Sequence, residues 1–177
     1  PPIADQETGT VLIEFIARDV PAIGYKTFYL AEAKTPSPQP EARLLKNSYE
    51  NNFYRVELVP GGIKSIFDKE LKCDILNTEK FLGFEIFIMQ SVGSGAGEFG
   101  RVQQPTKEGF DKLSAYNPSW KFDPSESGTS KAVFSFKQKL SNCFIKEKLI
   151  IYSELKRIDC EVSILSWDGT PYREFRL

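Results

Sequence analysis

The stretch KAVFSFKQKLSNCFIKEKLIIYSELKRIDCEVSIL, residues 131–165, decides the fold class of this chain. Its first nine residues alternate, and they place Ala132, Phe134 and Phe136 on one side. NCFIKEKLIIYS has the pattern of a long strand, and RIDCEVSIL alternates again between two rows of side chains. The inward row is Ile158, Cys160, Val162 and Ile164, and the outward row is Asp159, Glu161 and Ser163. Successive side chains of a β-strand point to opposite faces, so we expect three consecutive strands.

The same pattern continues toward the N-terminus of this stretch. In ENNFYRVELVPGGIKSIFDKELK, which starts at Glu50, Pro60-Gly61-Gly62 separates two alternating runs and predicts a hairpin. A second turn is expected at residues 68–70, and FEIFIMQSV, residues 84–92, is an apolar strand. Only EGFDKLSAY, residues 108–116, suggests a short helical turn. The expected fold is therefore all-β, a sandwich of large antiparallel sheets.

The N-terminal part is set off from the rest by proline. TVLIEFI points Val11, Ile13 and Phe15 to one face, and GYKTFYL, residues 24–30, is aromatic and strand-like. AKTPSPQPEA, residues 33–42, then holds three prolines in ten positions. Proline removes backbone donors and favours extended chain, which is typical of a linker. We therefore predict a small β unit with its linker over residues 1–42 and a larger β domain over residues 43–177.

Composition limits the chemistry that this chain can perform. Its net charge of −1, with both signs mixed, argues against nucleic acid as a partner, and no apolar run approaches the about 18 residues of a membrane helix. There is no histidine, which excludes Ser-His and Cys-His nucleophile pairs, and the cysteines lack zinc-site spacing, so we expect no cofactor or metal bound by this chain itself. Cys143 and Cys160 are expected to be small buried filler. An odd and sparse set of cysteines is not a disulfide framework, which favours a reducing compartment such as the cytoplasm.

The glycine-rich loop QSVGSGAGEFGRVQQP, residues 90–105, has three interpretations. A phosphate cradle needs a helix after the glycines, which the following GRVQQPT does not predict, and Glu98 would repel the anion. The loop can instead be an ordinary surface hairpin. It can also face a sugar, because Glu98, Phe99, Arg101, Gln103 and Gln104 supply an acceptor, an aromatic ring and planar donors.

Other candidate groups have plainer interpretations. The 24 acidic residues are scattered, and no spacing singles out a pair for glycoside hydrolysis. The run KEKLIIYSELKR, residues 146–157, is expected to be a solvated strand face. Trp120 and Trp167 are expected to pack in the core or at a sheet edge rather than to stack on sugars.

The Glu50–Leu76 stretch, ENNFYRVELVPGGIKSIFDKELKCDIL, resembles the opening of the C-terminal β domain of glycoside hydrolase family 38 α-mannosidases. That opening has Glu-Asn, a short strand, a glycine turn and a second strand ending in Asp-Lys-Glu. VPAIGYKTFYL is similar to the last strands of the small β domain that precedes it there. MQSVGSGAGEFGRVQQPT, RIDCEVSIL and YREFR also resemble bacterial members, so the resemblance extends over nearly the whole chain in order.

The resemblance implies a galactose-mutarotase-like supersandwich, incomplete at the C-terminus, within a longer protein. Family members are retaining enzymes that hydrolyse α-mannosides, with a zinc ion held by two histidines and two aspartates of a separate catalytic domain. None of those motifs is present here, so the resemblance implies a non-catalytic segment whose partners are the catalytic domain of the same chain and the α-mannoside. A loop of this domain lends a residue to the lip of the sugar pocket in some members. GSGAGEF matches that loop best, although Gly97-Glu98-Phe99 replaces its tyrosine, and Glu98 and Phe99 are the implied lip residues.

Two other functions remain open on the sequence. The chain can be a stand-alone carbohydrate-binding β-sandwich without catalysis. It can also be an architectural or interaction domain that contacts no sugar.

Overall fold

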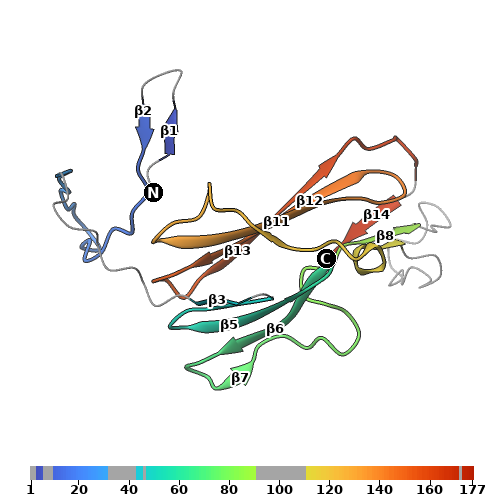
Figure 1. Cartoon of the computed structure of the whole chain (residues 1–177), viewed down its shortest axis with the longest axis horizontal. Coiled ribbons are helices and arrows are strands. Elements are labelled where there is room, and N and C mark those ends of the chain that lie inside the picture. The colour runs from blue at the N-terminus through green and yellow to red at the C-terminus, as the bar shows by residue number, and fades with distance from the viewer. Residues whose placement is uncertain (1–2, 6–9, 32–42, 46, 91–110, 172) are drawn as a thin grey trace.

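The fold is all-β, and every strand pair is antiparallel, as expected (Figure 1). The computed structural model describes residues 3–5, 10–31, 43–45, 47–90, 111–171 and 173–177. The strands are β1 (Ile3–Asp5), β2 (Thr10–Leu12), β3 (Arg43–Leu45), β4 (Ser48–Glu50), β5 (Tyr54–Val59), β6 (Gly62–Asp68), β7 (Cys73–Asp74), β8 (Phe87–Gln90), β9 (Asp111–Lys112), β10 (Lys121–Phe122), β11 (Lys131–Lys139), β12 (Phe144–Tyr152), β13 (Ile158–Leu165) and β14 (Arg173–Arg176). One short 3-10 helix, η2 (Leu113–Tyr116), is the short helical turn that the sequence predicts.

The strands form four sheets. The largest has five strands in the order β3-β4-β5-β6-β7, and the next has four in the order β10-β11-β12-β13. A three-stranded sheet has the order β14-β8-β9, and β1 pairs with β2 alone. In Figure 1 the β1–β2 hairpin stands apart, while the four-stranded sheet lies over the five-stranded one.

The core lies between these layers, as a sandwich requires. One apolar cluster joins the five-stranded sheet to the four-stranded sheet and includes Val56, Ile63 and Leu149. A second cluster joins β8 and η2 to β11 and β12 and includes Ile88 and Ile145. The inner face of the four-stranded sheet therefore carries two apolar clusters side by side.

Trp120 links the two clusters from the segment before β10. It packs against both clusters, lies 4.6 Å from Phe136 between ring centroids, and donates a hydrogen bond from Nε1 to the Gly62 carbonyl oxygen at 3.1 Å. The prediction that this tryptophan packs in the core is confirmed. Trp167 is 38% exposed and stacks edge-on against Phe175, which places it at the surface near β14.

The predicted hairpin is confirmed as β5–β6, with Pro60 and Gly61 as its turn residues. Gly61 has φ +81°, which a residue with a Cβ atom rarely adopts. A Cβ atom at Gly61 would also lie 2.6 Å from the Cα atom of Ser114 in η2. Glycine is therefore required at position 61 for two reasons, the positive φ of the turn and the close approach of η2.

Residues 24–30 do not form a strand, contrary to the prediction. Their backbone pairs with no other strand in the described part of the chain, and Ile23, Tyr25 and Tyr29 are 87–100% exposed. An aromatic-rich sequence becomes a strand only when a neighbour completes its hydrogen-bond ladder. Ile13 and Phe15, predicted to share one face, are exposed as well, at 47% and 54%.

Two details of the central strands also differ from expectation. Ile164 is 44% exposed, although it belongs to the inward row, because β13 is the edge of its sheet and the facing layers cover β11 and β12. The run of residues 146–157 is not simply a solvated face, since Leu149, Ile150 and Ile151 are buried. Only part of that run, including Lys146, faces solvent.

Candidate functional site

The residues predicted to contact a sugar, Glu98, Phe99 and Arg101, lie outside the described residues, as do Gln103 and Gln104. The strands on either side of that loop are described. Phe87 and Ile88 of β8 pair with Lys112 and Asp111 of β9. The loop therefore leaves and re-enters the same three-stranded sheet at neighbouring strands, and its contact with a sugar stays a prediction. The boundary predicted at residue 42 adjoins residues 32–42, which also lie outside the described part.

The motif that carries the resemblance binds the two large sheets together. Asn51, which follows β4, is 2% exposed and donates from Nδ2 to the Tyr152 carbonyl oxygen of β12 at 2.8 Å. Its Oδ1 atom accepts hydrogen bonds from the backbone N–H groups of Phe53 (2.8 Å) and Tyr54 (2.7 Å). One buried side chain thus fixes the entry to β5 and links it to the opposite layer.

The Asp-Lys-Glu end of the motif does the same from β6. Asp68 Oδ1 accepts hydrogen bonds from the backbone N–H groups of Glu70 and Leu71 at 2.9 and 3.0 Å, which forms the second predicted turn. Lys156, in the β12–β13 connection, lies 3.0 Å from Asp68 Oδ2 and also pairs with Glu70. The hydrogen bond from Leu71 is the main cause that lowers the pKa of Asp68, and Lys156 adds to it. The Asp68 carboxylate is therefore held in its charged form.

Lys69 joins the two halves of the motif. Its Nζ atom lies 2.7 Å from Glu50 Oε1 and donates to the Asn51 carbonyl oxygen at 2.6 Å. We call Glu50, Asn51, Asp68, Lys69 and Glu70, with their partners Tyr152 and Lys156, the inter-sheet network. Every one of these contacts is internal to the fold, so the network serves stability and not ligand binding.

Glu147 is the buried acid that sequence reasoning missed. It lies in the middle of β12, is 2% exposed, and both of its carboxyl oxygens lack a hydrogen-bond partner among the described residues. The two apolar clusters flank it, with Ile145 on one side and Leu149 on the other. The signal was present in the sequence, because Glu147 alternates in phase with these two residues and so points inward.

Glu85 is a second buried carboxyl group near Glu147. It precedes β8, is 3% exposed, and accepts hydrogen bonds from the backbone N–H groups of Leu82 and Ser114 at 3.1 and 3.3 Å and from the Ser114 hydroxyl. Burial, and to a lesser extent the charge of Glu85, raise the pKa of Glu147 from 4.5 to about 8. Glu147 is therefore a neutral carboxylic acid at pH 7.

A protonated carboxyl group near a second carboxyl group is the arrangement that glycosidases use for acid catalysis. Here both side chains are almost completely covered, at 2% and 3% exposure, so a sugar cannot reach either of them. The pair Glu85 and Glu147 is consequently a feature of the core.

Two of the three thiols, those of Cys143 and Cys160, are equally unsuited to nucleophilic chemistry. Cys143 is buried in the second apolar cluster, which confirms its predicted role as buried apolar filler, whereas Cys160 packs against the first cluster but is only partly buried. Burial raises the pKa of both thiols, and for Cys160 the charge of Glu147 adds to it. Both are held as thiols rather than thiolates.

The described part of the chain lacks two further kinds of feature. It has no group of three or more His, Cys, Asp or Glu side chains that could hold a metal ion. It has no helix long and apolar enough to cross a membrane.

Comparison with known proteins adds no relative to this description. No family model matches the chain, and neither a curated protein nor a solved structure matches it.

Proposed function

We propose that this chain is a non-catalytic β-sandwich segment of a zinc-dependent retaining α-mannosidase of glycoside hydrolase family 38. In that role it supports the catalytic domain, and its loop at residues 91–110 completes the sugar pocket with Glu98, Phe99 and Arg101. The zinc ion would be held by the catalytic domain, since this sequence has no histidine to supply the family's two-histidine, two-aspartate set.

The inter-sheet network is the observation that carries the proposal. The Glu50-Asn51 and Asp68-Lys69-Glu70 segments, on which the resemblance rests, are 16 or more residues apart and meet through Lys69. Each side chain of these two segments has a structural partner. Residues that hold a fold together in this way are expected to recur in proteins that share the fold. The covered state of Glu85 and Glu147 agrees with a supporting role, because neither can act on a sugar.

The exposed apolar side chains of residues 13–31 also support a role as part of a larger enzyme. They include Phe15, Ile23, Tyr25, Tyr29 and Leu30, which are 54–100% exposed. The segment is attached to the sandwich by ion pairs, from Glu14 to Lys131 and from Arg18 to Glu154. Contiguous exposed apolar surface usually marks an interface, and the proposal assigns this one to the preceding domains of the parent enzyme.

The proposal is tested by assaying hydrolysis of an aryl α-mannoside. The 177-residue chain and the product of the complete reading frame are assayed side by side, each with and without a zinc chelator. We expect activity only in the complete product, and we expect the chelator to abolish it. Turnover by the 177-residue chain, or a complete product that is inactive with zinc present, would overturn the proposal.

A further inference from the structure

Three neighbouring strands each place a lysine on the outer face of the four-stranded sheet. Lys121 of β10 is opposite Ser135 of β11, and Lys137 of β11 is directly opposite Lys146 of β12. Cross-strand partners share a face, and so do residues two apart on one strand. These positions therefore lie on one face, opposite to the face that carries Phe136 and Glu147.

The three lysines line a groove on that face. Its volume is about 650 Å³, and Ser119 and Ser135 contribute hydroxyl groups to its wall. Among the described residues, none that lines it is acidic. A groove of this volume is in the range that binds sugar-sized molecules.

The lysines of this groove have no carboxylate partner among the described residues. No described Asp or Glu lies within ion-pair distance of Lys121, Lys137 or Lys146, and the Nζ atom of Lys137 lies 4.9 Å from the centroid of the Phe144 ring. Because Lys137 and Lys146 are directly opposite, their like charges repel and destabilise the sheet. A bound anion would remove that repulsion.

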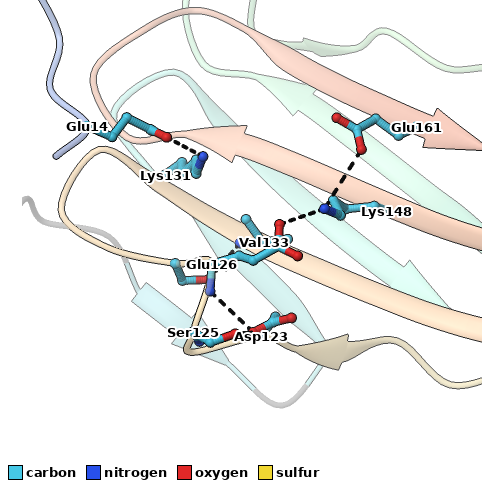
Figure 2. A network of polar contacts seen from close by, with 9 residues as sticks. Glu14, Asp123, Ser125, Glu126, Lys131, Val133, Lys148 and Glu161 are labelled. Carbon is cyan, nitrogen blue, oxygen red and sulfur yellow. Dashed lines mark hydrogen bonds and ion pairs between the residues drawn. The ribbon is translucent and has the colours of Figure 1, made fainter. Parts of the chain in front are cut away.

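The acids of the outer face are engaged further along the sheet. Figure 2 shows Lys148 of β12 between Glu126 and Glu161, whose carboxylate oxygens lie 2.6 and 3.8 Å from its Nζ atom. The same figure shows Glu14 paired with Lys131. Positive charge is therefore balanced at that end of the face and left unbalanced in the groove, although the whole chain has a net charge of −1.

We propose that this groove binds a sugar that carries two or more phosphate or sulfate esters. The ammonium groups of Lys121, Lys137 and Lys146 pair with the ester oxygens, because lysine binds such groups as a mobile point charge. The hydroxyl groups of Ser119 and Ser135 exchange hydrogen bonds with the hydroxyl groups of the sugar. The proposed site uses no residue of the segment 91–110, and it does not depend on the proposed function.

Isothermal titration of the 177-residue chain at low ionic strength tests the site. Sucrose octasulfate is the sulfate probe, inositol hexakisphosphate is the phosphate probe, and free sucrose is the uncharged control. We expect saturable binding of at least one charged probe, no binding of sucrose, and weaker binding as salt is added. Binding of one probe and not the other identifies the ester and supports the proposal equally.

Two variants establish where the probe binds. In Lys137→Gln/Lys146→Gln the affinity falls about tenfold or more, because two of the three charges that face the anion are lost. In the single variant Lys121→Gln the affinity for the probe falls by a smaller factor, and this variant is measured if the double variant does not fold. The matched control Lys64→Gln/Lys80→Gln removes the same charge from exposed lysines elsewhere and keeps the affinity of the wild type. Absence of binding to both probes, or an equal loss in the control variant, would overturn the proposal.

Discussion

Glu147 places a carboxyl group between two apolar clusters, where its charged form is strongly disfavoured. Its proton is held because the alternative is an unpaired charge at a position only 2% exposed. Gly61 is constrained just as strongly for a steric reason, since its backbone touches η2. At the scale of single residues, the fold therefore requires a protonated Glu147 in the core and a residue without a Cβ atom at position 61.

The stability of the protein is predicted to fall as the pH rises from 5 to 9. The folded state keeps the proton of Glu147 up to a pKa of about 8, whereas the unfolded state releases it near 4.5, so the folded state binds more protons over this range. The loss is at most on the order of 4 kcal/mol. Urea unfolding across this pH range should show a much flatter profile for Glu147→Gln. The exposed Glu57→Gln should behave as the wild type, and a variant Glu147→Gln with an unchanged slope would contradict the assignment.

Gly61→Ala is predicted to destabilise the fold by about 2 kcal/mol or more, because the new Cβ atom adds a clash with Ser114 to the strain of a positive φ. Gly169 provides the matched control. It has the same φ of +81°, but a Cβ atom there would have no neighbour within 4 Å. Gly169→Ala should therefore cost only the conformational strain, about 1 kcal/mol. Chemical denaturation measures both, and equal costs would show that the approach of η2 imposes no constraint.

At the scale of elements, the inter-sheet network fixes how β4, β5 and β6 meet β12. Its contacts span 101 residues between Asn51 and Tyr152 and 88 residues between Asp68 and Lys156. Hydrogen bonds between layers are directional, so they add orientation to the apolar contacts of the core.

Asn51→Ala is predicted to lower the free energy of unfolding by about 3 kcal/mol, because it leaves the Tyr152 carbonyl and two backbone N–H groups without this partner. The neighbouring Asn52 is exposed and supplies the matched control, Asn52→Ala, which should change stability little. Urea unfolding monitored by tryptophan fluorescence checks both variants. A similar small effect in the two variants would mean that the network does not join the sheets.

How far the sequence predicts this fold depends on how local each feature is. Alternation identifies β5, β11 and β13, and Pro60-Gly61-Gly62 predicts the turn between β5 and β6, because strand pleat and turn geometry are set by neighbouring residues. The failure at residues 24–30 and the exposure of Ile164 depend on which strand lies alongside, which periodicity does not contain. For the candidate site, the roles of Glu98, Phe99 and Arg101 stay predictions.

The sequence predicts that Glu147 points inward, but it does not predict that its carboxyl group is unpaired and protonated. Its phase along β12 matches that of Ile145 and Leu149, which places it inward. Its lack of a partner depends on the packing of Glu85 and Trp120 from other elements. The groove lysines are a similar case, since only the cross-strand register brings Lys137 opposite Lys146.

At the scale of the whole molecule, the sandwich is well covered inside but carries apolar surface on residues 13–31. Ile23, Tyr25, Tyr29 and Leu30 are each at least 79% exposed. The isolated chain is therefore predicted to bind the dye 8-anilinonaphthalene-1-sulfonate. Tyr25→Ser/Tyr29→Ser/Leu30→Ser should reduce the dye fluorescence by roughly half or more without changing the unfolding midpoint. The control is Leu71→Ser, at an exposed leucine in the turn between β6 and β7. An equal reduction of the dye fluorescence in this control would contradict the assignment of this surface.

We propose that this sandwich supports an α-mannosidase and takes no part in its bond-breaking step. The most direct measurement compares the complete reading-frame product with its Asn51→Ala variant, using kcat and KM for an aryl α-mannoside and the half-life of activity at elevated temperature. We predict an active wild type, unchanged kcat and KM in the variant at low temperature, and a half-life shortened by about tenfold or more, since about 3 kcal/mol of stability is lost. An inactive wild type, or a variant whose kcat falls while its half-life is unchanged, would contradict the account.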